Sequence, residues 1–264
     1  MIDKSQIEQI LNTTIFGKYL YVFSEVESTN FTAMEFAREG APEGTVVIAG
    51  HQTAGKGRMG RKWEDESGKN ILMSLVLRPQ LDIESVQRIT LACADILIHS
   101  FEQFLINRGI KPLDFSVKWP NDILVNGKKI AGILTESRLA EKHIEFIVVG
   151  IGINVNQKIE NLSKDIQHSA TSFLAETGNS FPLQNLIVQI LSDFEQNYFR
   201  LERTNYDSVI EDWKSHCNQF GNSIIIETAF GEENGLFHDI NERGILLYKT
   251  DGGEIKELVA GTIK

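Results

Sequence analysis

The chain has 264 residues, of which 42% are hydrophobic and 23% charged, and its formal net charge is −10. These values are typical of a globular protein with one large domain, or one domain and a small appendage. The acidic balance argues against a nucleic-acid-binding protein, which usually presents a broad basic face. No apolar run approaches the roughly 18 residues of a membrane span, and Met1–Gln6 lacks the basic and apolar parts of a signal peptide.

The two cysteines and six histidines form no metal-binding pattern. Cys93 and Cys217 lie far apart, and the histidines are scattered without paired spacing. We therefore expect a cytoplasmic protein with two free thiols and no zinc site, and a single disulfide is the alternative. Cys93 lies on an apolar helical face and Cys217 near a helix end, so packing explains both better than catalysis does.

Short elements alternate in the first 80 residues. Periodicity and turn residues predict two helices, over Ser5–Leu11 and Phe31–Arg38, and three strands, over Tyr19–Phe23, Thr45–Ala49 and Asn70–Leu77. Ser28, Thr29 and Asn30 stand where a helix N-cap is expected, and capping alone would explain them. Gln52 reads as an ordinary polar residue when it is taken in isolation.

Longer elements follow. Apolar residues recur at a helical period over Ile83–Ile106, and Phe115–Trp119 is a predicted strand that stops at Pro120. Asn126-Gly127 between apolar runs predicts a hairpin, because both residues accept a positive φ. The remaining predictions are a strand over Ile144–Asn154, an irregular segment over residues 157–170, and helices over Leu183–Leu201 and Tyr206–Phe220.

The chain changes character after Gly221. Short β-rich runs alternate there with Gly, Asn and Asp turns, and this texture predicts a small β-barrel. The predicted strands are Ser223–Thr228, Gly235–Asp239, Gly244–Lys249 and Glu254–Val259.

The segment Gly55–Trp63, called the glycine–cation loop below, is the most informative part of the sequence. Three glycines alternate there with four cations, Lys56, Arg58, Arg61 and Lys62. Glycine lets backbone N–H groups face one point, and with Lys and Arg they can hold phosphate or carboxylate oxygens. The segment lacks the context of a dinucleotide-binding loop or a P-loop. A mobile basic loop or nucleic-acid patch is the alternative, but the acidic chain favours a small anionic ligand.

Lys118–Asp122 is the second informative segment. Strand alternation puts Lys118 on the face opposite its two apolar neighbours, where a lysine is costly unless an anion pairs with it. A lysine that reaches solvent from a sheet edge is the alternative. Gly150 and Gly152 leave room beside a long strand for a ligand or for close packing. The sequence shows neither a Gly-x-Ser-x-Gly nucleophile nor distinctive paired carboxylates, so the chemistry indicated is cationic stabilisation of an anionic reaction.

Five motifs in order resemble those of the biotin–protein ligases. They are Ser28–Asn30, Gly55–Trp63, Lys118–Asp122, Lys129–Leu134 and Gly150–Asn154. Each is weak alone, but their order matches, and the matching texture runs from about residue 20 to the C-terminus. The resemblance implies an α+β fold: a mixed β-sheet flanked by helices in a catalytic domain (residues 1–220), then a small C-terminal SH3-like β-barrel (residues 221–264).

The resemblance also implies a two-step enzyme. The biotin carboxylate attacks the α-phosphate of ATP, which gives biotinyl-5′-AMP and pyrophosphate. A lysine amine on a biotin carboxyl carrier protein then attacks the activated carbonyl and releases AMP. No covalent enzyme intermediate is needed, in keeping with the missing nucleophile. The expected cofactor is Mg²⁺, carried mainly by the ATP phosphates and not by a dedicated protein metal site.

The resemblance assigns a role to each motif. Lys118 and Arg58 are the expected catalytic residues, because cations offset the repulsion between carboxylate and triphosphate. The residues expected at biotin are Ser28, Thr29, Asn30, Gln52, Lys56, Gly57, Arg58, Lys118, Gly150 and Gly152. Those expected at the nucleotide are Arg58, Arg61, Trp63, Lys118 and Asn154. The glycine–cation loop would order over the intermediate as a lid.

Two loop residues depart from the family pattern. Lys56 and Met59 stand where the family has arginines; Lys56 keeps the charge without the bidentate fork, and we assign Met59 no role. A lipoate– or octanoate–protein ligase is the nearest enzymatic alternative, and a biotin-responsive DNA-binding repressor is an alternative of another class. Because few residues precede the first strand, we expect the short, enzyme-only type, with no nucleic acid or membrane partner and with a homodimer plausible.

Overall fold

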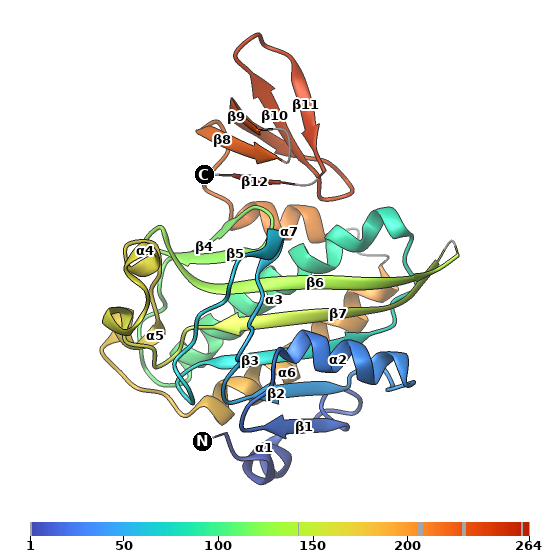
Figure 1. The fold of residues 1–264 in the computed structure, drawn as a ribbon, viewed down its shortest axis with the longest axis vertical. Helices are drawn as coiled ribbons and strands as arrows, with labels where there is room; N and C mark the ends of the chain where they lie inside the picture. Colours follow the sequence, from blue (N-terminus) through green and yellow to red (C-terminus); the bar gives the residue numbers. More distant parts are fainter. Residues whose placement is uncertain (1, 142, 205–207, 229–230, 260, 264) are drawn as a thin grey trace.

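The computed structural model describes residues 2–141, 143–204, 208–228, 231–259 and 261–263, in two parts stacked end to end (Figure 1). A seven-stranded sheet of order β1-β2-β3-β7-β6-β5-β4 forms the middle of the larger part. The β1–β2 pair is parallel and the other pairs are antiparallel, so the sheet is mixed. Its strands are β1 (Leu20–Phe23), β2 (Val46–Ala49), β3 (Ile71–Leu77), β4 (Phe115–Lys118), β5 (Asp122–Val125), β6 (Lys128–Ala140) and β7 (His143–Ile153).

Helices cover both faces of this sheet. The helices that the structure describes are α1 (Lys4–Ile10), α2 (Thr29–Arg38), α3 (Val86–Ile106), α4 (Lys164–Gln167), α5 (Phe173–Thr177), α6 (Leu183–Arg203) and α7 (Val209–Ser215). Short 3₁₀ turns lie at η1 (Arg58–Gly60), η2 (Ile83–Ser85) and η3 (Ile159–Asn161). Helix α3 packs on α6, α7 and β6, whereas α2 packs on β2, β3 and β7.

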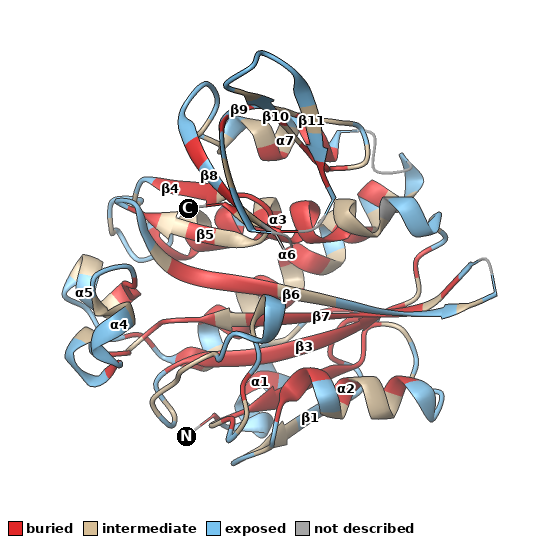
Figure 2. Cartoon of the chain, turned by 45° about the horizontal axis from the view of Figure 1, so that its top comes forward, coloured by how far each residue is buried: buried red, intermediate tan, exposed pale blue. Residues whose placement is uncertain are grey.

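Alternation along the strands explains why both faces are covered. In β2, Val46 and Ile48 belong to the large core that includes α3 and α6, while Val47 belongs to a second, smaller core under α2. Every residue of β2 and β3 is buried, as Figure 2 shows for the middle of the sheet. Strands that are buried on both faces have nearly continuous apolar sequences, and the sequences of β2 and β3 follow this pattern.

Helix α3 is long and apolar enough to cross a membrane by length and composition. However, 72% of its most apolar window is buried inside the protein. Together with its packing on α6, α7 and β6, this burial makes α3 the central core helix of the larger part.

The C-terminal part is a five-stranded antiparallel sheet of order β11-β10-β9-β8-β12, consistent with the small barrel expected there. Its strands are β8 (Ser223–Thr228), β9 (Gly231–Ile240), β10 (Leu246–Thr250), β11 (Ile255–Leu258) and β12 (Thr262–Ile263). The α+β prediction is confirmed, and the domain boundary at residue 221 stays a prediction.

Most predicted elements are present, with differences at several ends. The Asn126-Gly127 hairpin is confirmed, with φ values of 51° and 74°. The helix predicted over Tyr206–Phe220 is too long: the structure has α7, and residues 205–207 lie outside the described residues. Helix α7 ends early because the His216 carbonyl leaves it to accept the Val117 N–H at 3.1 Å. Elements α4, α5 and β12 were not predicted.

The aromatic core beneath α6 supports a stability prediction. Phe194 is 2% exposed, and its ring lies 5.4 Å from that of Phe16 and 6.2 Å from that of Tyr198. We expect Phe194→Ala to lower the free energy of unfolding by about 3–5 kcal/mol, because it leaves a cavity among these rings. The matched change Phe31→Ala, at a side chain 48% exposed, should cost roughly 0.5 kcal/mol or less. Chemical denaturation measures both, and equal losses would contradict this assignment of the core.

Candidate active site

The glycine–cation loop folds back on itself as a narrow hairpin. The Trp63 N–H donates to the Gly55 carbonyl at 2.9 Å, and the Gly57 N–H donates to the Arg61 carbonyl at 2.7 Å. At the tip, Met59 and Gly60 have φ values of 53° and 74°. This left-handed turn favours glycine, so Met59 is held in an uncommon conformation for a residue with a side chain.

The two ends of the loop are fixed. The His51 ring nitrogen Nδ1 lies 2.7 Å from the Asp65 carboxylate, whose side chain is 1% exposed. The next segment is tied to residues 157–163, since Glu64 accepts from the Ser163 N–H at 3.0 Å and Glu66 from the Asn161 amide at 3.0 Å. The base of the predicted lid is therefore joined to the segment predicted to be irregular.

The Lys118–Asp122 segment is the turn between β4 and β5. Lys118 and Asp122 stand opposite each other in the hairpin register. The Trp119 indole N–H donates to the Gly244 carbonyl in the C-terminal part at 3.0 Å, and the Asn121 amide donates to the Ile133 carbonyl at 2.7 Å. The turn that carries Lys118 is thus held from both sides.

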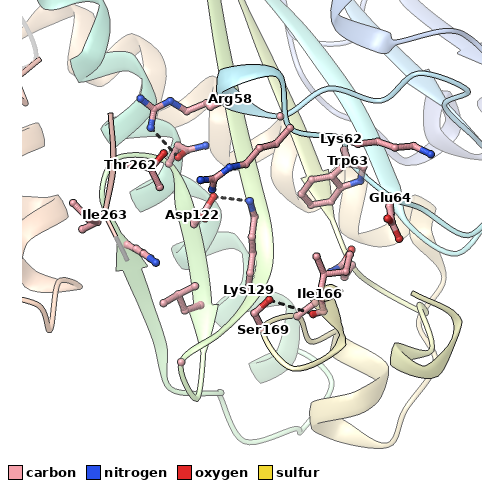
Figure 3. Close-up of a pocket in the computed structure, with 18 of the residues that line it drawn as sticks. Arg58, Lys62, Trp63, Glu64, Asp122, Lys129, Ile166, Ser169, Thr262 and Ile263 are labelled. Carbon is pink, nitrogen blue, oxygen red and sulfur yellow. Dashed lines mark hydrogen bonds and ion pairs between the residues drawn. The ribbon is translucent and has the colours of Figure 1, made fainter. Parts of the chain in front are cut away.

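Cations from three segments meet around this turn. The Arg58 guanidinium donates to the Asn121 amide oxygen at 3.4 Å and lies 5.9 Å from the centroid of the Trp119 ring. The Lys129 ammonium pairs with Asp122 at 2.7 Å and lies 5.4 Å from the Trp63 ring centroid. Figure 3 shows Asp122 and Lys129 between Arg58 on one side and Trp63 on the other.

Burial, together with nearby charges, lowers the pKa of Lys118 and of Arg58. Burial lowers the pKa of Lys118 below its ordinary value; Asp122 opposes this shift, and the positive charges of Arg61 and Lys129 add to it. Burial also lowers the pKa of Arg58, again opposed by Asp122 and reinforced by Arg61. A bound anion would stabilise these charges, so the pocket favours a negatively charged ligand.

Two abutting cavities share Gly57, Arg58, Trp63, Asn121 and Lys129 as lining residues. The larger, of about 790 Å³, contains every residue expected at the nucleotide. The smaller, of about 50 Å³, is lined by every residue expected at biotin except Lys118, which lines the larger one. The structure therefore brings together residues that are more than 120 positions apart in the sequence.

The narrow cavity is organised by Gln52. Its side-chain oxygen accepts from the Thr29 N–H at 2.7 Å, at the start of α2. Ser28 is the N-cap residue of α2 by position, but its side chain makes no capping hydrogen bond. Ser28–Asn30 thus lie at the start of a helix as expected, but Gln52, from the segment after β2, supplies the side-chain acceptor for an N–H of the first turn.

Asn30 is held within the protein. Its amide nitrogen donates to the Leu134 carbonyl at 3.1 Å and to Glu136 at 2.7 Å, and its oxygen accepts from Ser74 at 2.7 Å. The side chain thus forms a fixed wall of the cavity. Glu136 and Ser74, which hold it, gave no signal in the sequence.

The glycines of β6 and β7 admit protein side chains. A Cβ added at Gly150 would lie 2.0 Å from the Asn30 side-chain oxygen, and one at Gly152 would lie 2.6 Å from the Trp63 ring. At Gly132 it would lie 2.8 Å from Lys129. These three positions let Asn30, Trp63 and Lys129 approach the sheet closely.

Two polar atoms of the larger cavity lack partners. Among the residues that the structure describes, four buried side-chain atoms make no hydrogen bond, and two of them are Trp63 Nε1 and Asn154 Oδ1. Buried polar groups are normally satisfied, so an unpaired donor and acceptor in one cavity wall fit a polar ligand. Trp63 and Asn154 are both residues expected at the nucleotide.

The structure adds Lys129 and Asp122 to the site residues predicted from sequence. Both belong to quoted motifs, and the Asn126-Gly127 hairpin between them was the signal that could have placed them together. The cysteines stay outside the site: burial raises the pKa of Cys217 to about 11 and raises that of Cys93 as well, which disfavours thiolates.

Known proteins match this chain along its whole length. Residues 22–154 match the Biotin/lipoate A/B protein ligase family. The chain is 35% identical to the bifunctional ligase/repressor BirA of Bacillus subtilis, over 100% of this chain and 79% of that protein. It is 29% identical to the biotin–[acetyl-CoA-carboxylase] ligase of Mycobacterium tuberculosis, over 99% and 94% of the two chains.

A solved structure matches the fold as well. The biotin protein ligase from Aquifex aeolicus in complex with biotin and ATP superimposes with a TM-score of 0.75 at 27% identity, covering 94% of this chain and 98% of that one. Sequence, fold and the order of the motifs agree, and the chain belongs to the biotin/lipoate A/B protein ligase family.

Proposed function

We propose that this protein is an ATP-dependent biotin–protein ligase that makes biotinyl-5′-AMP and transfers biotin to a lysine of a carrier protein. The observation that carries the proposal is the pair of abutting cavities, with Arg58 and Lys129 in the wall they share. A carboxylate in the narrow cavity and a triphosphate in the wide one would meet at these cations. The ligases from M. tuberculosis and A. aeolicus described above support the choice of biotin and ATP.

Cations make the first step possible. Carboxylate and triphosphate repel each other, and Lys118, Arg58 and Lys129 offset that repulsion and stabilise the charge that develops at phosphorus. Because these side chains are partly buried, their charges act through a medium of lower dielectric than water. The new bond forms between the biotin carboxylate oxygen and the α-phosphorus as the bond to pyrophosphate breaks.

The two ends of the intermediate are held by different groups. Ser28, Thr29 and Gln52 hold the biotin end, backed by the Asn30 wall and by the Lys56–Gly57 backbone. Trp63, Asn154 and Arg61 contact the nucleotide, where Trp63 Nε1 and Asn154 Oδ1 offer an unpaired donor and acceptor. Gly150 and Gly152, which have no side chains, form the floor of the smaller cavity.

The phosphates of ATP would carry Mg²⁺ into the site. Among the described residues, no group of three or more His, Cys, Asp or Glu side chains is arranged to hold a metal ion. Mg²⁺ keeps waters and binds through substrate phosphates in many such enzymes, and it would supply further neutralisation of the triphosphate here.

The second step needs a lysine from outside the chain. A biotin carboxyl carrier domain is the partner that the family relationship supports, and its lysine attacks the acyl carbonyl while AMP leaves. The glycine–cation loop retains the mixed anhydride until that lysine arrives, because water would hydrolyse it.

Substrate choice tests the proposal directly. Pyrophosphate release from ATP should require biotin and proceed at most weakly with lipoate or octanoate. Faster pyrophosphate release with lipoate or octanoate would mean that this acid, and not biotin, is the substrate. Release with none of the three acids would contradict a ligase of this type.

Lys118→Ala should slow biotinyl-AMP formation by about 10²–10³-fold while the fold is retained, because one cation is lost where charge develops. Pyrophosphate release at saturating biotin and ATP measures this. Lys111→Ala, at an exposed loop lysine, is the matched control and should leave the rate unchanged. A Lys118→Ala rate within a few-fold of wild type would remove Lys118 from the mechanism.

Ligand should protect the glycine–cation loop from trypsin. Its cations repel one another and its glycines are costly to fix until an anion arrives, whereas its ends are already held by Asp65 and Glu64. Cleavage after Lys56, Arg58, Arg61 and Lys62 should fall when biotin and ATP are added together. The same cleavage rate with and without ligand would contradict the lid.

Arg58→Gly should release the intermediate early. The change removes the guanidinium that bridges the two cavities and loosens the loop, while Lys118 and Lys129 still support adenylation. The escaped anhydride reacts with any exposed amine, so the variant should biotinylate bystander albumin and wild type should not. If the variant makes biotinyl-AMP but labels only its carrier, Arg58 does not retain the intermediate.

A further inference from the structure

The tip of the glycine–cation loop rests on the C-terminal sheet. Arg61 Nη2 lies 3.1 Å from the Glu227 carboxylate of β8, and Thr262 of β12 donates its hydroxyl to the Met59 sulfur at 3.3 Å. Thr262 and Glu227 are directly opposite each other in the β8–β12 ladder. Two residues that face each other across neighbouring strands of the C-terminal sheet therefore hold two side chains of the loop tip.

This contact involves the wall of the nucleotide cavity. Arg61 lines the larger cavity from the loop side, and Thr262 and Ile263 line it from the C-terminal part, as Figure 3 shows for the two barrel residues. A triphosphate in this cavity would present oxygens to the same guanidinium that Glu227 engages. Carboxylate and phosphate are the two anions for which an arginine is best suited, so they compete for it.

Arg61 needs a counter-charge before ATP arrives. Its positive charge is one of the causes that lower the pKa of both Arg58 and Lys118, so the three cations repel one another in the ligand-free site. Glu227 offsets the charge of Arg61 at the loop tip. The pair is easily broken, because its side chains are 57% and 35% exposed and such a pair changes an equilibrium constant by only about two- to fivefold.

We propose that Glu227 competes with ATP for Arg61: it holds Arg61 against the C-terminal sheet in the free enzyme and releases it when ATP binds. Glu227 acts as an internal substitute for a phosphate, and Met59 and Thr262 add a second contact beside it. The role rests on the proposed function, because it needs ATP in the larger cavity. Binding ATP breaks the pair, so Glu227 lowers the affinity for ATP and leaves the chemical step unchanged.

Glu227→Gln tests this role while keeping the size of the side chain. In the presence of biotin, the dissociation constant of a non-hydrolysable ATP analogue should fall about two- to fivefold, with the KM for ATP falling in parallel and kcat staying within twofold. Glu254→Gln, which removes the same charge from an exposed position of the C-terminal part, is the matched control and should change neither constant. Because salt screens exposed pairs, the gain should disappear in roughly 1 M salt.

A double-mutant cycle with Arg61→Ala assigns the effect to the pair. In that background Glu227→Gln should lose most of its effect on ATP affinity. Equal biotin affinity and equal Tm for wild type and Glu227→Gln would show that both are folded alike.

Several results would overturn the role. Weaker ATP binding by Glu227→Gln would mean that Glu227 aims Arg61 at the nucleotide. If wild type is active and Glu227→Gln leaves the affinity for ATP unchanged, the pair does not affect ATP binding. If Glu227→Gln still raises the affinity for ATP in the Arg61→Ala background, Glu227 acts on ATP without Arg61. A wild type that releases no pyrophosphate from biotin and ATP would instead overturn the proposed function, and this role with it.

Discussion

Like charges confined to one partly buried space are the constraint on which this site depends. Arg58, Arg61, Lys118 and Lys129 line a single cavity, where Asp122 is paired with Lys129 and Glu227 with Arg61. Burial and crowding make the charges of Lys118 and Arg58 costly, and the pKa values of both are lowered. A reaction that joins two anions gains most from such a site, because the entering anions relieve the repulsion among the cations and so bind more favourably.

The fold assembles these cations from segments that would repel one another if left free. The loop is fixed at its ends by His51–Asp65 and by the contacts of Glu64 and Glu66, while its tip rests on the C-terminal sheet. The turn that carries Lys118 is held through the Trp119 indole, which donates to Gly244. The C-terminal part therefore supports the site at two points.

Local patterns allowed much of this to be predicted from the sequence. The Asn126-Gly127 hairpin and the glycine–cation loop depend on backbone conformations that a few neighbouring residues decide. Gln52 as the acceptor at the start of α2 could not be predicted, since it comes from a segment 23 residues away and Ser28 stood in the expected place. The same holds for the contact of Arg61 with Glu227, which joins parts of the chain that are 166 residues apart. Such pairs follow from tertiary packing, which short-range sequence patterns do not contain.

A crystal structure with biotin and a non-hydrolysable ATP analogue tests the central claim most directly. The account predicts that the biotin carboxylate and the α-phosphate meet where the two cavities join, with phosphate oxygens within about 3 Å of Lys118 Nζ and of the Arg58 guanidinium. Trp63 should then lie against the nucleotide. A complex in which the phosphates lie away from both cations, or in which biotin occupies the wide cavity, would contradict the account.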